Sequence, residues 1–131
     1  MKFKICFFVT LFLLFSSCTN RTKSDFQFIS FDNDSVTINI SKETPDYEVF
    51  NQLLFRGFPN SNQTMPLIST SEREIEQQFP QYFNLFFKEN RYKTFITSST
   101  KNQDGSYRIL VNTKALKLDL EQNSIIRKFG Y

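Results

Sequence analysis

The sequence predicts an α+β domain over residues 25–131, with an antiparallel-rich sheet covered by two main helices. Two observations support this fold class. The stretches 26–41 and 93–111 each hold two apolar segments separated by a polar turn, which is typical of hairpins. Apolar residues recur at helical spacing over 45–56 and again over 69–90. Because helices and sheets bury their apolar faces against each other, we expect the helices to cover the sheet.

The first hairpin is predicted from alternation. Phe26–Phe31 leads into a polar turn at 32–34, after which Val36, Ile38 and Ile40 alternate with polar residues. Successive side chains of a strand point to opposite faces, so the second strand has one apolar face. We expect that face to be buried.

The first helix is predicted over about 45–56. Thr44 is a hydroxyl N-cap, Pro45 suits the first helical position, and Gly57 is a natural C-terminal stop. One face of this helix is apolar and carries Tyr47, Phe50, Leu53 and Leu54. The loop that follows, Phe58–Ser69, is long for a compact domain, and loops of that length are often functional.

The second helix is predicted to begin near Ser69 to Ser71 and to end near Asn90. Its apolar residues recur at helical spacing, at Ile75, Phe79, Tyr82, Phe83, Phe86 and Phe87. Pro80 interrupts this pattern, and proline removes a backbone donor and clashes with the preceding turn, so we expect a kink or a break there. The many phenylalanines are interpreted first as core residues.

The C-terminal part is predicted to add strands and one ambiguous segment. Residues 93–100 and 107–111 form the second hairpin, around a turn that contains glycine. Residues 113–122 alternate like a strand, but Asn112 can cap a helix there, and the helix is favoured because Thr113-Lys114 makes a poor hairpin turn. Residues 125–129 are predicted as a last strand.

The N-terminus predicts a lipoprotein signal peptide at 1–17. Two lysines precede the apolar stretch Ile5–Phe15, which is shorter than the roughly 20 residues that a membrane span requires. The five residues LFSSC that end at Cys18 resemble the bacterial lipobox, with Phe15 where that family usually has leucine. This resemblance implies acyl chains such as palmitate on Cys18, and hence the membrane as a partner. The alternatives are an ordinary secretory signal or a short uncut anchor.

The composition then excludes several functions. Removing 1–17 leaves 14 basic and 13 acidic residues, a net charge of +1, which is a poor match to nucleic acid. The sequence contains no histidine, Cys6 leaves with the signal, and lipid consumes Cys18. These absences exclude Ser-His and Cys-His catalysis and the commoner zinc sites. We therefore expect no metal and no cofactor.

Further resemblances suggest a location in the cell envelope. Residues 18–24 are polar and are predicted as the lipidated tether. The triplet Asp-Ser-Val around Ser35 resembles the O-glycosylation sequon of exported Bacteroidota proteins, which implies a sugar on Ser35. Surface lipoproteins of that phylum carry an acidic run after the lipidated cysteine; residues 19–25 have none, which implies the outer membrane facing the periplasm. Three stretches resemble small uncharacterised lipoproteins of the same phylum, namely Leu53–Pro59, Tyr92–Ser99 and Asn112–Gly130.

Acidic residues at two places suggest acid/base or calcium chemistry, but each has a simpler interpretation. Glu72, Glu74 and Glu76 are two residues apart, so neighbours in the series point in different directions on a helix, and early glutamates complement its dipole. Asp119 and Glu121 lie near lysines, which is typical of a solvated charged surface. No catalytic residue is predicted.

The candidate interaction site is Arg56, Gly57, Phe58 and Pro59, where an arginine and an aromatic meet at the end of a helix. Arginine and aromatic residues often anchor interfaces, although a cation at a helix C-terminus also needs no ligand. The sequence favours a non-catalytic, membrane-anchored periplasmic module that binds an envelope protein or another envelope component. The alternative is a small histidine-independent hydrolase or lyase that uses carboxylates and tyrosine.

Overall fold

The computed structural model describes residues 25–59 and 61–127; the predicted signal peptide and the tether with Cys18 lie outside them. The predicted α+β class is confirmed, because a four-stranded antiparallel sheet of order β1-β2-β4-β3 packs with helices. The strands are β1 Phe26–Phe31, β2 Ser35–Ile40, β3 Ile96–Lys101 and β4 Tyr107–Asn112. The α-helices of the described part are α2 Pro45–Phe55, α3 Glu72–Gln78, α4 Pro80–Phe83 and α5 Thr113–Gln122.

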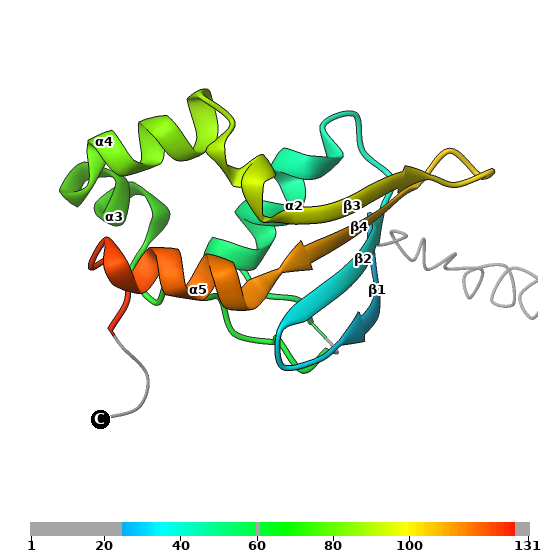
Figure 1. Ribbon diagram of the computed structural model, residues 1–131, viewed down its shortest axis with the longest axis horizontal. Helices are drawn as coiled ribbons and strands as arrows, with labels where there is room; N and C mark the ends of the chain where they lie inside the picture. Colours follow the sequence, from blue (N-terminus) through cyan, green and yellow to red (C-terminus); the bar gives the residue numbers. More distant parts are fainter. Residues whose placement is uncertain (1–24, 60, 128–131) are drawn as a thin grey trace, which may run out of the picture.

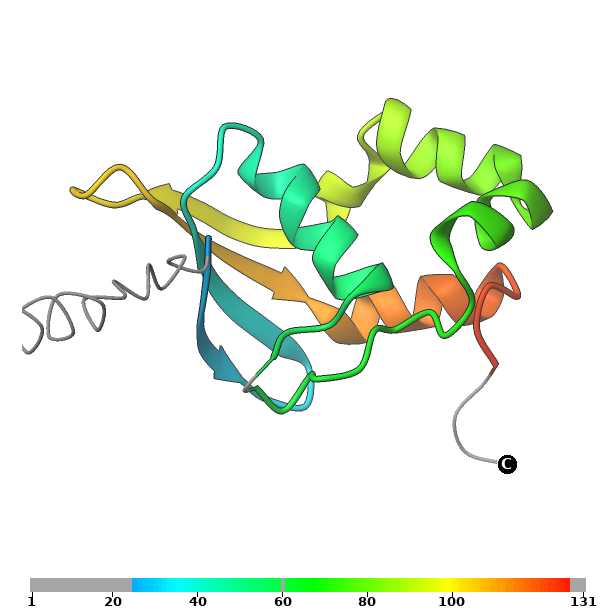
Figure 2. The same ribbon diagram turned by 180° about the vertical axis from the view of Figure 1, so that it is seen from behind.

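The elements form two regions (Figures 1 and 2). The sheet region consists of the sheet, of α2, which crosses one of its faces, and of α5, which continues from the end of β4. Helices α3 and α4, with the π-helical turn η2 Asn84–Lys88 that extends α4, lie beyond the sheet. We call α3, α4 and η2 the helical arm.

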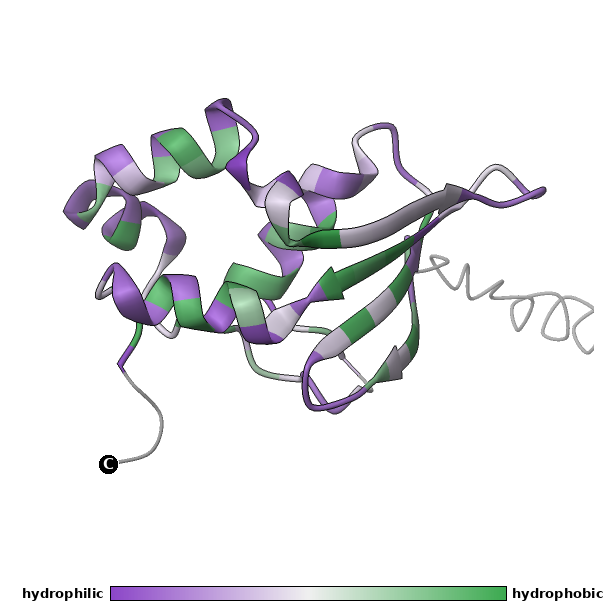
Figure 3. Cartoon of the chain, viewed as in Figure 1, coloured by the Kyte–Doolittle hydropathy of each residue, from purple (hydrophilic) through white to green (hydrophobic). Residues whose placement is uncertain are grey.

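The predicted alternation of β2 determines which face of the sheet is buried. Val36, Ile38 and Ile40 are fully buried, and β4 places Val111 and Ile109 opposite the first two. The intervening residues of β2 are only half-buried. Figure 3 shows the corresponding alternation of colour along β2. The apolar face packs against α2, as the sequence predicts.

Helix α2 begins and ends close to the predicted bounds. Pro45 occupies the first turn after Thr44, and the amide of Gly57 donates to the Gln52 carbonyl at 2.8 Å. Gly57 has a φ of +72°, and a Cβ atom there would lie 2.3 Å from the Thr64 carbonyl oxygen. Glycine is therefore required both for the left-handed turn and for the close approach of the loop.

The second predicted helix is broken at Pro80, as expected. Helix α3 ends before Phe79, whose φ and ψ of −127° and 55° are not helical, and α4 begins at Pro80. Proline is well tolerated there, because its missing amide would be unsatisfied in a first turn. Asn90, with a left-handed φ of 58°, follows η2 and ends the arm at the predicted place.

The predicted strand at 93–100 begins too early. Residues Arg91–Phe95 form a 3-10 turn, η3, and β3 begins at Ile96. Tyr92 and Phe95 are both buried, and residues three apart lie on the same side of a 3-10 turn but on opposite faces of a strand. Burying both rings therefore favours the turn.

The predicted helix at 113–122 is confirmed as α5. Its N-cap Asn112 accepts a hydrogen bond from the Ala115 amide at 2.9 Å, and Leu116 and Leu120 are fully buried whereas Leu118 is exposed. A strand would place all three leucines on one face.

The last predicted strand, 125–129, is wrong over its described residues, because 125–127 form no strand. Ser124 has a φ of 61°, and the Ile125 amide donates to the Leu120 carbonyl at 2.9 Å. This bond caps the end of α5, and Ile125 packs in the core as the apolar residue that commonly follows such a cap. Residues 128 and 129 lie outside the described part.

Aromatic rings join the helical arm to the sheet region, as the interpretation of phenylalanines as core predicts. Phe86 of the arm lies 5.8 Å from Phe50 of α2 and 6.1 Å from Phe95, between ring centroids. Tyr92 completes the cluster, 5.3 Å from Phe50. Edge-to-face, tilted and stacked ring pairs all occur in this cluster, and aromatic pairs are favourable beyond the area that they bury.

Candidate functional site

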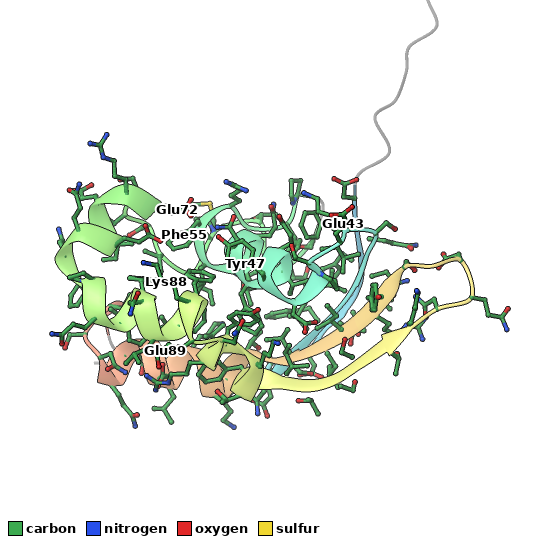
Figure 4. All side chains as sticks on the ribbon, turned by 90° about the horizontal axis from the view of Figure 1, so that it is seen from above. Glu43, Tyr47, Phe55, Glu72, Lys88 and Glu89 are labelled. Carbon is green, nitrogen blue, oxygen red and sulfur yellow. The ribbon has the colours of Figure 1, made fainter. Side chains whose placement is uncertain are left out.

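A groove separates α2 from the helical arm. It forms an open cavity of about 410 Å³, a size within the usual range for ligand sites. Its lining residues come from α2, α3, α4 and η2, and are Tyr47, Glu76, Pro80, Phe83, Asn84, Phe87 and Lys88. Figure 4 shows the labelled side chains of Tyr47, Phe55, Glu72 and Lys88 gathered between these helices.

The wall of the groove is aromatic. The ring of Tyr47 lies 5.1 Å from that of Phe87, and Phe55 lies 6.0 Å from Phe83 and 6.3 Å from Phe87. Helical spacing produces this wall, because Phe83 and Phe87 are four residues apart on the arm, and Tyr47 and Phe55 are eight apart on α2. Tyr47 is 37% exposed, so part of its ring is available to a ligand.

Two glutamates border the aromatic wall. Glu72 and Glu76 are one helical turn apart on α3, so they share a face. Asn51, a buried polar residue of α2, donates to Glu72 Oε1 at 3.0 Å, and Arg56 Nη2 lies 4.0 Å from Glu72 Oε2. The sequence interpretation considered the glutamates only at a spacing of two and so missed this pair. The spacing of four was the signal that could have found it.

Glu76 and Lys88 both line the groove, which therefore carries charges of both signs. Burial and the Glu72 carboxylate raise the pKa of Glu76, and Lys88 opposes them. Burial also raises the pKa of Tyr47, followed by the effects of Glu72, Glu48 and Glu76, while Arg56 acts in the opposite direction. Both groups therefore experience more from neighbouring carboxylates than from neighbouring cations. A carboxylate whose pKa is raised by burial and by a second carboxylate is often found in functional sites.

The predicted interaction residues 56–59 do not form one exposed surface. Phe58 is 2% exposed, and its ring lies 5.7 Å from that of Phe26, so it belongs to the core. Gly57 is buried under the loop, whereas Arg56 and Pro59 are exposed. Through its contact with Glu72, Arg56 lies beside the groove.

The predicted O-glycosylation site, Ser35, lies at the β1–β2 turn. Ser35 begins β2 and is half-buried, and its Oγ donates to Asp32 Oδ2 at 2.9 Å. Asp32 also accepts from the amides of Asp34 and Ser35 at 2.8 Å, and these bonds lower its pKa, the Asp34 amide most strongly. The Ser35 hydroxyl thus takes part in the turn. Cys18 lies outside the described residues.

A second polar cluster connects the arm to α5. The Tyr82 hydroxyl donates to Asp119 Oδ2 at 2.7 Å, Arg91 forms an ion pair with Asp119 Oδ1, and the Arg91 guanidinium lies 5.7 Å from the Tyr82 ring centre. Burial, together with the Asp119 carboxylate, raises the pKa of Tyr82 far above its ordinary range. The expectation that Asp119 is solvated is therefore wrong. A tyrosine held protonated in this way is a structural clamp and a poor general base.

The described residues contain neither a metal-binding cluster nor a membrane-spanning helix. No group of three or more acidic, cysteine or histidine side chains is placed to hold a metal ion within 25–59 and 61–127. In the same part of the chain, no helix has the length and apolar character needed to cross a bilayer.

Comparisons with known proteins add no relative. No protein-family model, curated protein or solved structure matches the chain. The groove is therefore the feature that indicates function, since sites rather than folds determine function.

Proposed function

We propose that this protein is a lipid-anchored envelope lipoprotein that binds a protein partner, without catalysis, through the groove between α2 and the helical arm. The observation that carries the proposal is the groove itself: an aromatic wall bordered by two glutamates, in a cavity of about 410 Å³. Aromatic residues that remain accessible are typical anchors of interfaces.

The position of the groove agrees with an anchor on Cys18. Strand β1 begins on the side of the sheet opposite the helical arm (Figures 1 and 2). Six residues lie between Cys18 and Asp25, and the segment that joins these two residues spans at most about 25 Å. A lipid on Cys18 would therefore keep the start of β1 near the membrane and direct the arm away from it, toward a periplasmic partner.

One observation favours the alternative of a small hydrolase or lyase. The pKa of Glu76 is raised beside a second carboxylate, and unequal carboxylates are used as acid and base by several enzymes. We prefer binding because exposed residues such as Asn84 and Lys88 line the groove, which leaves it open to water. The Tyr82 hydroxyl already donates its proton to a hydrogen bond with Asp119, so it is not placed to act as a general acid or base in the groove.

Blocking the groove tests the proposal. Asn84 is exposed and lines the cavity, so Asn84→Trp should fill the groove without disturbing the core. We expect this variant of the lipidated chain to capture its partner from envelope extracts at least about tenfold more weakly, a change of about 1.4 kcal/mol. Gln77→Trp is the matched control, because Gln77 is exposed on α3 and does not line this cavity. Equal losses in both variants, or none in either, would count against the groove.

A further inference from the structure

The charges around the groove indicate what kind of partner group it accepts. On α3 and α2 the carboxylates of Glu72, Glu76 and Glu48 act on the Tyr47 hydroxyl, whereas Arg56 is the cation that opposes them. Lys88, on η2, is the cation that acts on Glu76. Arg56 is a loose partner, since its side chain is 57% exposed and its nitrogen is 4.0 Å from Glu72. Such exposed pairs contribute little, so a cation of the partner can replace Arg56 at Glu72.

We propose that the groove receives a basic side chain, arginine or lysine, from the protein partner, with the alkyl stem on the aromatic wall and the charged head between Glu72 and Glu76. This inference rests on the proposed binding function and specifies the chemistry of that same site. The observations that carry it are the aromatic wall of Tyr47 and Phe87 and the glutamate pair at its border.

The shape of a basic side chain matches both parts of the groove. Lysine and arginine combine a long apolar stem with a cationic head, and they cover apolar surface with the stem while the head keeps polar contacts. The Tyr47 and Phe87 rings, inclined at 58°, offer π faces that attract a cation, and a guanidinium also stacks on them. The head can then donate hydrogen bonds to carboxylate oxygens of Glu72 and Glu76. These bonds are strong because donor and acceptor are both charged.

Charge complementarity also selects a protein over the membrane. Glu72 and Glu76 repel anionic headgroups from their border of the groove, where Lys88 is the opposing cation. The arm, which forms one wall of the groove, moreover lies away from the start of β1 (Figure 2). A basic segment of an envelope protein therefore satisfies both the charge and the position of the site.

A charge-matched pair of peptides tests the inference. The mature lipidated chain in zwitterionic micelles is titrated with acetyl-Ala-Arg-Ala-amide and, separately, with the same peptide carrying citrulline, which has the arginine shape without the charge. We expect the arginine peptide to shift the amide NMR signals of Tyr47, Glu76 and Phe87, and the citrulline peptide to bind at least fivefold more weakly. Equal binding of both peptides, or shifts only elsewhere, would overturn the inference.

Variants of the glutamates complete the test. The double change Glu72→Gln and Glu76→Gln keeps the Asn51 hydrogen-bond acceptor but removes both charges, and should weaken arginine-peptide binding at least fivefold. Glu74→Gln is the control, since Glu74 is exposed at the same helix and lines no part of this cavity. If Asn84→Trp abolishes partner capture while the double variant captures normally, the binding function stands and the basic-side-chain inference fails. If neither variant changes capture, the proposed function fails as well.

Discussion

Tyr82 illustrates at the residue scale how a hydrogen bond and an ion pair to one carboxylate connect three elements. Its hydroxyl belongs to α4, the acceptor Asp119 to α5, and the Arg91 that pairs with Asp119 to η3. Only 13% of the Asp119 side chain is exposed, so water replaces these contacts poorly when one partner is removed. Buried polar groups that lose their partners incur a desolvation cost, which makes this cluster important for the stability of the arm.

Tyr82→Phe should lower the free energy of unfolding at neutral pH by about 2 kcal/mol, because it removes a hydrogen bond to a charged group. Burial and Asp119 raise the pKa of Tyr82 above its ordinary value of 10.0, so above pH 10 the folded chain keeps a proton that the unfolded chain loses. The stabilisation is complete below that pH and decreases as the pH rises above it. Urea unfolding from pH 7 to 11 should therefore show a shallower alkaline decline in the variant.

A double-mutant cycle provides the control for this clamp. In an Asp119→Ala background, Tyr82→Phe should cost much less than in the parent chain, because the acceptor is already gone. An equal cost in both backgrounds would assign the effect of Tyr82 to packing rather than to the hydrogen bond.

At the scale of elements, the two long helices differ in how their first turns are satisfied. Asn112 accepts a hydrogen bond from the Ala115 amide at the start of α5, whereas the side chain of Thr44 makes no cap bond at the start of α2. Asn112→Ala should therefore lower the free energy of unfolding by about 1 kcal/mol. Thr44→Ala is the matched control and should change it far less. Chemical denaturation of both variants checks the difference, and similar losses would contradict it.

The sequence predicted those elements whose signals are local. Alternation defined β2, the Thr44-Pro45 and Gly57 signals bounded α2, and Pro80 marked the break in the arm. Non-local packing decided the rest. The Arg91–Phe95 turn forms because two buried rings need the same side, and Ile125 caps α5 instead of starting a strand.

The candidate site was less predictable for the same reason. The groove exists because the break at Pro80 lets Phe87 of the arm pack against Tyr47, which is about 40 residues earlier in the sequence. A one-dimensional pattern does not contain that contact. Arg56, the first residue of the predicted interaction segment, lies beside the groove. Phe58 is buried instead, because its ring packs against Phe26 and Phe28 of β1.

At the scale of the whole molecule, the sheet region and the helical arm have different parts in the proposed function. The sheet region carries the start of β1 and, through the tether, the predicted lipid (Figure 1). The arm provides one wall of the groove, and the aromatic cluster of Phe50, Phe86 and Phe95 joins it to the sheet. A partner bound at the arm would thus be separated from the membrane by a single packed domain.

This arrangement depends on the lipid, so Cys18→Ala should abolish labelling of the protein by a palmitate analogue and release it from the membrane fraction. Each buried methylene of an acyl chain contributes about 0.8 kcal/mol, and several chains are needed for stable anchoring. Cys6→Ala is the matched control, because Cys6 belongs to the signal peptide that is expected to be removed, and it should leave both labelling and fractionation unchanged. Protease added to intact cells should spare the wild-type protein if it faces the periplasm. Persistent labelling of Cys18→Ala would show that the acyl group is elsewhere, and the proposed orientation of the arm would lose its basis.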